Sequence, residues 1–421
     1  MAEHVAALRT QVARQVAHWT LAVSRLEDLE NVASASAWGG LERYLGVALR
    51  KNLVEAVARL RKETAVLRAQ LDAAQTAGEL ERVRSHVVAF RRRYTRTETL
   101  IDFYGDAVNT RTSPRMAALL GACDEMAVRS MRQLLDPLGK EPPPVLTYVD
   151  KGLGASILKA GLRVWDSGSL SAVAAIKIVF HNLLRPTALI HETGHQAAHI
   201  TGWNEELAQA LERGLAGAGR DVAEAWGSWA SEIAADTFAF AHTGYAAVTG
   251  LCDVLSGDEA TVFQLRPGDP HPIAWIRVLL GTEMCTRFFG AGPWDDLGSA
   301  WVQSYPIENA ARYGTEDLLR RSLPLLPGIV ELCLRTPMRA FGGRPLTSLI
   351  DPGRVKPEAL AQLELRAGQA LYTSPYWLWS EGLRLLALSG LRAATMPERT
   401  QEILKRQEDW MLRLGMAVKA A

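Results

Sequence analysis

Apolar residues recur at three- and four-residue intervals over the first third of the chain, the spacing of one helix face. The clearest stripe consists of Leu45, Leu49, Leu53, Val57, Leu60, Leu67 and Leu71, with Thr64 interrupting it. Helix breakers lie at 37–40, 76–78 and 109–114, and Ser113-Pro114 suits the start of a further helix. The pattern predicts four helices between Ala2 and about Leu138.

Three consecutive prolines, Pro142 to Pro144, follow these helices and cannot continue them, because proline lacks a backbone donor. We place a domain boundary there. Short β-like runs follow at 145–149, 162–165 and 173–180, and a second helical tract extends from Pro186 to the end. The expected fold is mainly α (α+β). It has a helical bundle over 1–140, a core with a sheet of two to four strands over 141–292, and a helical region over 293–421 that packs on the core.

Composition narrows the class of protein. The chain has 421 residues, of which 48% are hydrophobic and 22% charged, as in globular proteins of two or three domains. Lys and Arg number 47 against 46 Asp and Glu, so the net charge of +1 argues against nucleic-acid binding by the whole protein. A basic cluster between Arg82 and Arg96 is interpreted as a solvated helix face in preference to an anionic partner site.

The cysteines and the amino-terminal residues indicate the cellular compartment to expect. Cys123, Cys252, Cys285 and Cys333 are far apart, so neither a disulfide framework nor a thiolate zinc site is expected. The first residues lack the apolar core of a signal peptide, and no run of about 20 apolar residues suggests a membrane span. The expectation is a soluble, cytoplasmic protein.

Histidines concentrate between residues 181 and 271, around His191-Glu192-Thr193-Gly194-His195. In this H-E-x-x-H sequence, both imidazoles lie on one helix face and can bind one zinc ion. Glu192 lies beside them, where it can take a proton from water at the metal. The chain's composition predicts roughly 0.02 such motifs by chance, so the motif points to a metal site.

A third ligand is needed, and the metzincin spacing that would supply a histidine is absent. His199 would lie about 12 Å along the helix from His191, too far to share one ion. Glu232 is the better candidate because it lies in an otherwise apolar stretch, where a lone carboxylate is costly to bury. Asp236, one turn later, can accept the spare N–H of a metal-bound histidine. The rival ligands are Glu205, Glu206, Glu212 and Glu224.

A third segment contains two more side chains that could take part in catalysis. His271 lies between Pro270 and Pro272 at an expected helix start, and Arg277 follows within two helical turns. Either side chain could stabilise the oxyanion formed when water attacks a carbonyl. The alternative for His271 is a helix cap.

Taken together, H-E-x-x-H at 191–195, E-x-x-A-D at 232–236 and H-P-x-x-x-x-R at 271–277 resemble the gluzincin metallopeptidases. The pattern is most similar to the prenyl-protein-processing and heat-shock-type membrane family, over residues 171–290. The resemblance implies a zincin-like core, zinc ligands His191, His195 and Glu232, Glu192 as general base, Asp236 supporting a ligand, and His271 with Arg277 near the substrate carbonyl. Members of that family usually carry membrane helices, so a membrane substrate does not carry over.

The expected function is a zinc-dependent endopeptidase acting on a peptide or protein. Residues 173–180 would be the edge strand that receives an extended peptide. The aminopeptidase signature G-x-M-E-N is absent, which disfavours trimming from the amino terminus. The alternative is a helical interaction protein that retains an inactive gluzincin scaffold, although a scaffold needs no Glu192. Residues 2–138 hold none of these groups, so we expect the bundle to recognise a protein partner or substrate.

Overall fold

We describe a computed structural model covering residues 2–41, 43–152, 155–159, 173–266 and 268–420. These residues form a mainly α-helical protein with one small sheet, as the sequence predicts. The chain divides into a first compact unit up to Ala117 and a second formed by Ala118–Lys159 and the residues from Ala174 onward. The expected β-like run at 162–165 lies outside the described residues.

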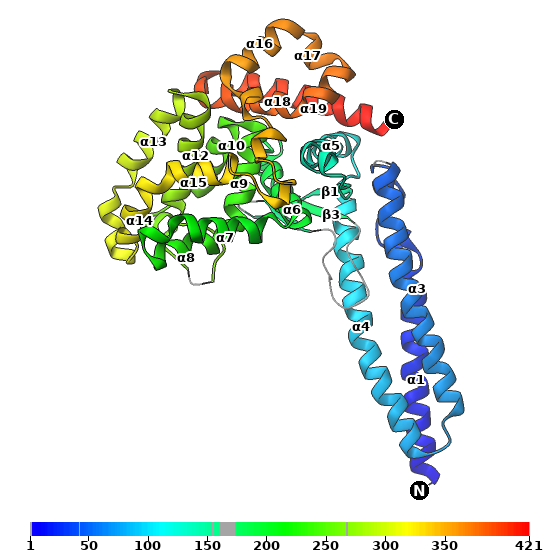
Figure 1. The fold of residues 1–421 in the computed structure, drawn as a ribbon. Coiled ribbons are helices and arrows are strands. Elements are labelled where there is room, and N and C mark those ends of the chain that lie inside the picture. Colours follow the sequence, from blue (N-terminus) through cyan, green and yellow to red (C-terminus); the bar gives the residue numbers. More distant parts are fainter. Residues whose placement is uncertain (1, 42, 153–154, 160–172, 267, 421) are drawn as a thin grey trace. The chain divides into compact units, whose positions relative to one another are not determined.

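Three long helices of the first unit lie side by side (Figure 1): α1 (Ala2–Leu26), α3 (Arg43–Ala73) and α4 (Ala77–Asn109). The short helix α2 spans Ala35–Trp38. The apolar stripe of α3 is buried, and Thr64 is buried with it. Thr76 caps α4, because its hydroxyl accepts the N–H of Glu79 at 3.2 Å while the Glu79 carboxylate accepts the N–H of Thr76 at 2.9 Å. The predicted breaks thus fall where these helices end.

Part of the basic cluster on α4 is paired on the surface. The Nε of Arg84 lies 2.6 Å from Glu81, and the Nε of Arg93 lies 2.7 Å from Glu63 of α3. All four side chains remain substantially exposed, so these contacts match the expected solvated helix face.

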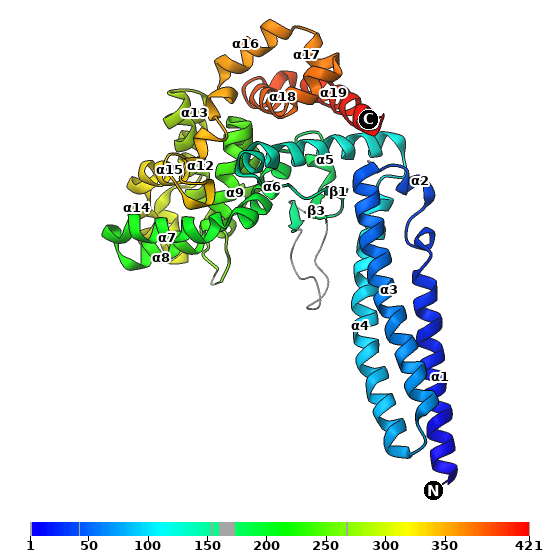
Figure 2. The same cartoon turned by 45° about the vertical axis from the view of Figure 1, so that its right-hand side comes forward.

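Helix α5 (Pro114–Leu135) begins at the predicted proline, but from Ala118 onward it belongs to the second unit. Figure 2 shows α5 beside β1 (Val145–Val149) and α6 (Thr187–Thr201). Asp124 of α5 accepts the backbone N–H of Thr147 in β1 at 2.7 Å. The division between the units therefore precedes the buried part of α5 and differs from the boundary expected near residue 140. Helical periodicity alone cannot tell which body a helix packs against.

The sheet has the order β1-β3-β2, with β2 at Ser156–Leu158 and β3 at Ala174–Ile178. Strand β3 pairs in parallel with β1, Val145 opposite Ala174, and antiparallel with β2. The prediction that residues 173–180 form an edge strand is therefore wrong, because β3 is central. Among the described strands the edges are β1 and β2, and the three residues of β2 are too few to carry a recognisable alternation.

The remaining helices all belong to the second unit. Their bounds are α7 Trp203–Leu215, α8 Arg220–Ser228, α9 Ala230–Thr243, α10 Tyr245–Leu255, α11 Glu259–Phe263, α12 Ala274–Phe289, α13 Pro293–Ser304, α14 Glu316–Ser322, α15 Leu326–Leu334, α16 Pro357–Ala367, α17 Ala370–Thr373, α18 Pro375–Thr395 and α19 Thr400–Ala420. Helices α13 and α15 pack on α12, and α18 packs on α10. These helices of the region 293–421 thus pack on the preceding helices within the same compact unit. Among the described residues, no helix combines the length and apolar character that crossing a membrane requires.

Helices α6 and α9 pack closely along each other, and Gly194 permits this approach. A Cβ atom added to Gly194 would lie 2.9 Å from the Cα of Ala235 on α9, closer than two carbon atoms tolerate. Phe238 of α9 is fully buried at the same contact. This packing decides which side chains of the two helices face each other.

Candidate metal centre

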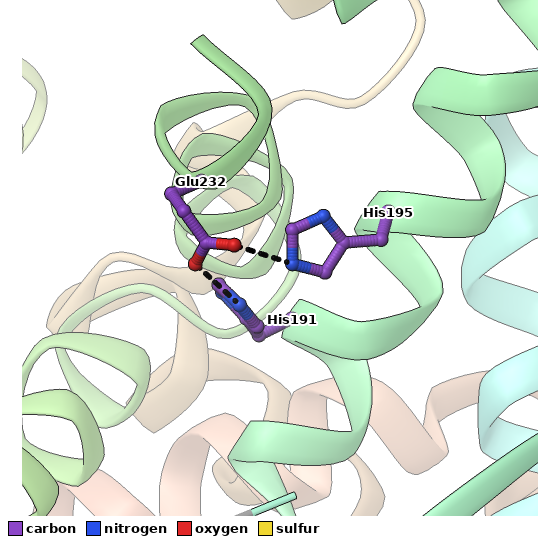
Figure 3. A group of neighbouring side chains, drawn as sticks. All are labelled: His191, His195 and Glu232. Carbon is purple, nitrogen blue, oxygen red and sulfur yellow. Dashed lines mark ion pairs between the residues drawn. The ribbon is translucent and has the colours of Figure 1, made fainter. Parts of the chain in front are cut away.

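Two histidines of α6 and one glutamate of α9 converge on one point. Figure 3 shows His191, His195 and Glu232 pointing toward one another. The Nε2 of His191 lies 3.4 Å from Oε2 of Glu232, and the Nε2 of His195 lies 3.2 Å from Oε1. One potential ligand atom from each residue lies within 4.8 Å of the other two. The structure thus brings together the three residues that the sequence singled out as ligands.

The donor set fits a tetrahedral metal ion such as zinc. Zinc holds nitrogen and oxygen ligands at about 2.0–2.1 Å, which places two tetrahedral ligand atoms about 3.3 Å apart. The Nε2 atoms of His191 and His195 lie 3.4 and 3.2 Å from different oxygens of Glu232, so each imidazole is at such a distance from one carboxylate oxygen. With one ligand atom taken from each residue, the three atoms lie within 4.8 Å of one another. Imidazole nitrogens and a carboxylate are donors that zinc prefers. The group can therefore hold a metal ion through three protein ligands.

Hydrogen bonds to the other ring nitrogens orient both histidines. The Nδ1 of His191 lies 2.8 Å from Oδ1 of Asp236, the partner that the sequence suggested. The Nδ1 of His195 lies 3.2 Å from the hydroxyl of Ser231. A histidine that donates its Nδ1–H in this way can bind a metal ion through Nε2 once the proton shared with Glu232 is lost. Sequence reasoning missed Ser231, whose only signal is its position beside Glu232.

Arg277 of α12 holds the two carboxylates of α9. Its side chain is 4% exposed, and it donates from Nε to Asp236 at 2.6 Å and from Nη2 to the same carboxylate at 2.9 Å. Nη2 also donates to Glu232 at 3.0 Å. The expectation was a guanidinium close to a substrate carbonyl. The structure instead engages it with Asp236 and Glu232, so its contacts are those of a group that positions the ligand carboxylate.

The charges in this cluster are strongly coupled. Burial opposes ionisation of Glu232, but hydrogen bonds from His191 and His195 and the charge of Arg277 outweigh it and lower the pKa of Glu232. Burial likewise opposes protonation of His191, yet hydrogen bonds to Asp236 and Glu232 raise the pKa of His191 to about 10. A metal ligand must be deprotonated, so a metal ion and a proton compete for His191.

Glu192 lies on α6 between the two histidines in sequence, and its carboxyl group lines the same cavity as His191 and Glu232. The side chain is buried, and burial together with the negative charge of Glu232 raises the pKa of Glu192, while both histidines oppose the rise. A carboxyl group with a raised pKa is a more effective general base near neutral pH. Its placement is the one expected from the motif.

His271 reaches the same group from the loop before α12. Its Nε2 lies 3.5 Å from Oε2 of Glu232, and 55% of its side chain remains exposed. Asp269 fixes the ring, because its carboxylate hydrogen-bonds both the Nδ1 and the backbone N–H of His271. Asp269 had no assigned role in the sequence analysis, although it stands two residues before the histidine. His271 thus combines a fixed ring with access to solvent.

The rival ligands lie elsewhere. His199 is exposed near the end of α6, Glu206 accepts the backbone N–H groups of Arg339 and Ala340, and Glu224 pairs with Arg220. Glu205 and Glu212 are exposed on α7. The choice of Glu232 over these residues agrees with the geometry.

A cavity of about 310 Å³ adjoins the cluster. Its lining includes His191, Glu192, Glu232, His271 and Arg277, together with apolar side chains of α9, α10 and α12. Sequence reasoning did not predict it, since its walls come from helices far apart in the chain. A molecule in this cavity would contact both the donor group and an apolar wall.

Comparison of the chain with protein-family models, with curated proteins and with solved structures found no match. The likeness to gluzincins is therefore carried by three short motifs.

Proposed function

We propose that this protein is a zinc-dependent peptidase that cleaves within peptide chains. The observation that supports the proposal is the convergence of two imidazoles and a carboxylate next to a cavity whose lining includes His191, Glu192 and Glu232. Three protein ligands leave a fourth position for water or substrate, as catalytic zinc sites require. A purely structural zinc site would be closed by a fourth protein ligand.

The proposed roles follow from the contacts. Bound zinc would supply a Lewis acid that polarises the carbonyl and acidifies water. Glu192 accepts the proton of the attacking water and passes it to the leaving nitrogen. His271, whose ring Asp269 holds, would stabilise the oxyanion that develops on the carbonyl through its Nε2 side. Asp236 and Arg277 hold His191 and Glu232 in place.

The proposed path of the peptide runs along β2. Ala155, directly before this strand, lines the cavity, and within the described part of the chain β2 pairs with a strand on one side only. An extended peptide can add to such an edge through backbone hydrogen bonds. Strand β2 takes over the role that the sequence analysis gave to residues 173–180.

The decisive test compares Glu192→Gln with Glu205→Gln, a matched change at an exposed glutamate of α7. Glu192→Gln should retain zinc and lose at least about 100-fold in hydrolysis of an unstructured protein, since a general base contributes 10²–10⁴-fold. Glu205→Gln should behave as the native protein. Cleavage products would be identified by mass spectrometry, with and without a chelator. Equal turnover of the Glu192→Gln and native proteins would reject the proposal.

A second outcome would favour the alternative, a helical interaction protein with an unused metal site. Zinc bound at full occupancy, with no cleavage by the native protein across a proteome-derived peptide mixture, would support that alternative. Glu192 is buried and lines the cavity in either case. Both functions include a bound zinc ion, so peptide cleavage distinguishes them and zinc content does not.

A further inference from the structure

We infer that the cavity beside the metal centre binds one large apolar side chain of the substrate, adjacent to the bond that is cleaved. This inference rests on the proposed peptidase function and concerns its substrate class. The cavity adjoins the donor group, and large apolar side chains from α9, α10 and α12 form much of its wall. They include Phe240, Val248, Leu251, Leu255, Leu280 and Met284.

Apart from Glu192, the charged groups that line the cavity contact one another. Among the described residues of its lining, every charged side chain belongs to the cluster of His191, Glu192, Glu232, Asp236, His271 and Arg277. Asp236 and Arg277 neutralise each other, and Glu232 is bonded by Arg277 and by both histidines. A lysine or aspartate side chain of a substrate would therefore lose its water without gaining a partner at the apolar wall. An apolar side chain gains free energy from the same transfer.

The volume suits a large side chain. A cavity of roughly 150 Å³ lined by aliphatic and aromatic side chains can hold benzene. The cavity described here is about 310 Å³, within the range of pockets that bind small ligands. It can accept a leucine side chain or a phenylalanine ring, whereas an alanine side chain would leave most of it unfilled.

Small residues keep this space open and define its walls. Gly281 of α12 lies against Val248 of α10, where an added Cβ atom would approach the Val248 side chain to 3.0 Å. Ala247 of α10 also lines the cavity and is only half-buried, so a longer side chain there has room to enter it. Met284 closes part of the wall from α12 and is fully buried. A larger side chain at Ala247 would therefore reduce the cavity, and a smaller one at Met284 would enlarge it.

The test uses the zinc-loaded full chain and acetylated octapeptides that differ at one residue, which is Ala, Leu, Phe, Asp or Lys. We expect cleavage on one fixed side of Leu and Phe, with kcat/KM at least tenfold above the Ala peptide and 100-fold above the Asp and Lys peptides. Ala247→Leu should lower the ratio of kcat/KM for the Phe peptide to that for the Ala peptide at least tenfold. Ala300→Leu, the same change at an exposed position of α13, is the matched control.

Equal cleavage of all five peptides, or an unchanged Phe-to-Ala ratio in Ala247→Leu, would overturn the inference while leaving the peptidase proposal standing. If Ala247→Leu does not fold, Met284→Ala supplies the second variant. Because Met284→Ala enlarges the cavity, it should raise kcat/KM for a Trp peptide relative to the Phe peptide. An unchanged ratio would contradict the inferred apolar site.

Binding separates this inference from the proposed function. If the native protein cleaves no peptide, calorimetry on the Glu192→Gln protein decides the matter. At least tenfold tighter binding of the Phe peptide than of the Ala peptide, abolished by Ala247→Leu, would keep the apolar site and reject hydrolysis. Binding without that preference would reject the apolar site.

Discussion

Replacing Arg277 by leucine should destabilise the second unit far more than replacing a surface arginine. Arg277 is 4% exposed and donates three hydrogen bonds to two carboxylates of α9, Asp236 and Glu232. Leucine fills much of the same space but leaves both buried carboxylates without the guanidinium. Removing one partner of a buried ion pair typically costs 3–5 kcal/mol, so we expect a loss of about 4 kcal/mol in the metal-free protein.

The control is Arg220→Leu on α8. Its Nε also lies 2.6 Å from a carboxylate oxygen, that of Glu224, but its side chain is 90% exposed. The ion-pair distance is the same in the two pairs, and only the environment differs. Water solvates both charges of the surface pair, so the variant should be indistinguishable from the native protein in stability.

Urea unfolding in the presence of a chelator, followed by tryptophan fluorescence, measures both changes. Among the described residues, seven buried tryptophans belong to the second unit and report on its unfolding: Trp203, Trp226, Trp229, Trp275, Trp294, Trp301 and Trp410. The reasoning fails if Arg277→Leu costs less than about 1 kcal/mol, or no more than Arg220→Leu. Either result would mean that the carboxylates of α9 find other partners or water.

Three further changes test other parts of the structure. Purified protein should contain about one zinc per chain by elemental mass spectrometry and Glu232→Ala should lose it, whereas full occupancy in that variant would exclude Glu232 as a ligand. Burial lowers the pKa of His242 to about 3. Between that pH and the pKa of about 6.5 in the unfolded chain, only the unfolded chain binds the proton. The free energy of unfolding therefore decreases by about 1.4 kcal/mol for each pH unit of acidification in this range. His242→Asn should reduce the loss between pH 6.5 and 5 by about 2 kcal/mol in urea titrations, and equal losses in both proteins would contradict this assignment. A chain that starts at Glu141 lacks α5 and the hydrogen bond between Asp124 and Thr147, so it should show no cooperative unfolding by circular dichroism. A folded fragment would instead support a domain boundary near residue 140.

Local patterns predicted the parts of the molecule that depend on neighbouring residues. The stripe from Leu45 to Leu71 needs only helical periodicity, and the pairing of His191 with His195 needs only one helical turn. Glu232 was identifiable because an isolated carboxylate in an apolar helix must have a partner. Each of these inferences uses a short-range rule, and each agrees with the geometry.

The features that were missed depend on packing between distant segments. Strand β3 reads as an apolar run whether it is central or at an edge, and only its pairing with both β1 and β2 decides the matter. The partners of Arg277 are set by the packing of α12 against α9. Arg277 and its partner Asp236 are 41 residues apart in the sequence. The cavity needs short side chains on α9, α10 and α12 to meet at one place, and no single segment contains that information.

The spacing of the donors along the chain makes the centre a reversible cross-link. His191 and Glu232 enclose a loop of 41 residues that contains α7 and α8. Closing such a loop costs an unfolded chain about 1.5RT ln 41, or about 3 kcal/mol, besides a constant. An ion held by both helices, as proposed, constrains the loop in the way that a disulfide does. Its removal should quicken amide hydrogen exchange in α7 and α8 and leave the three-helix first unit unaffected.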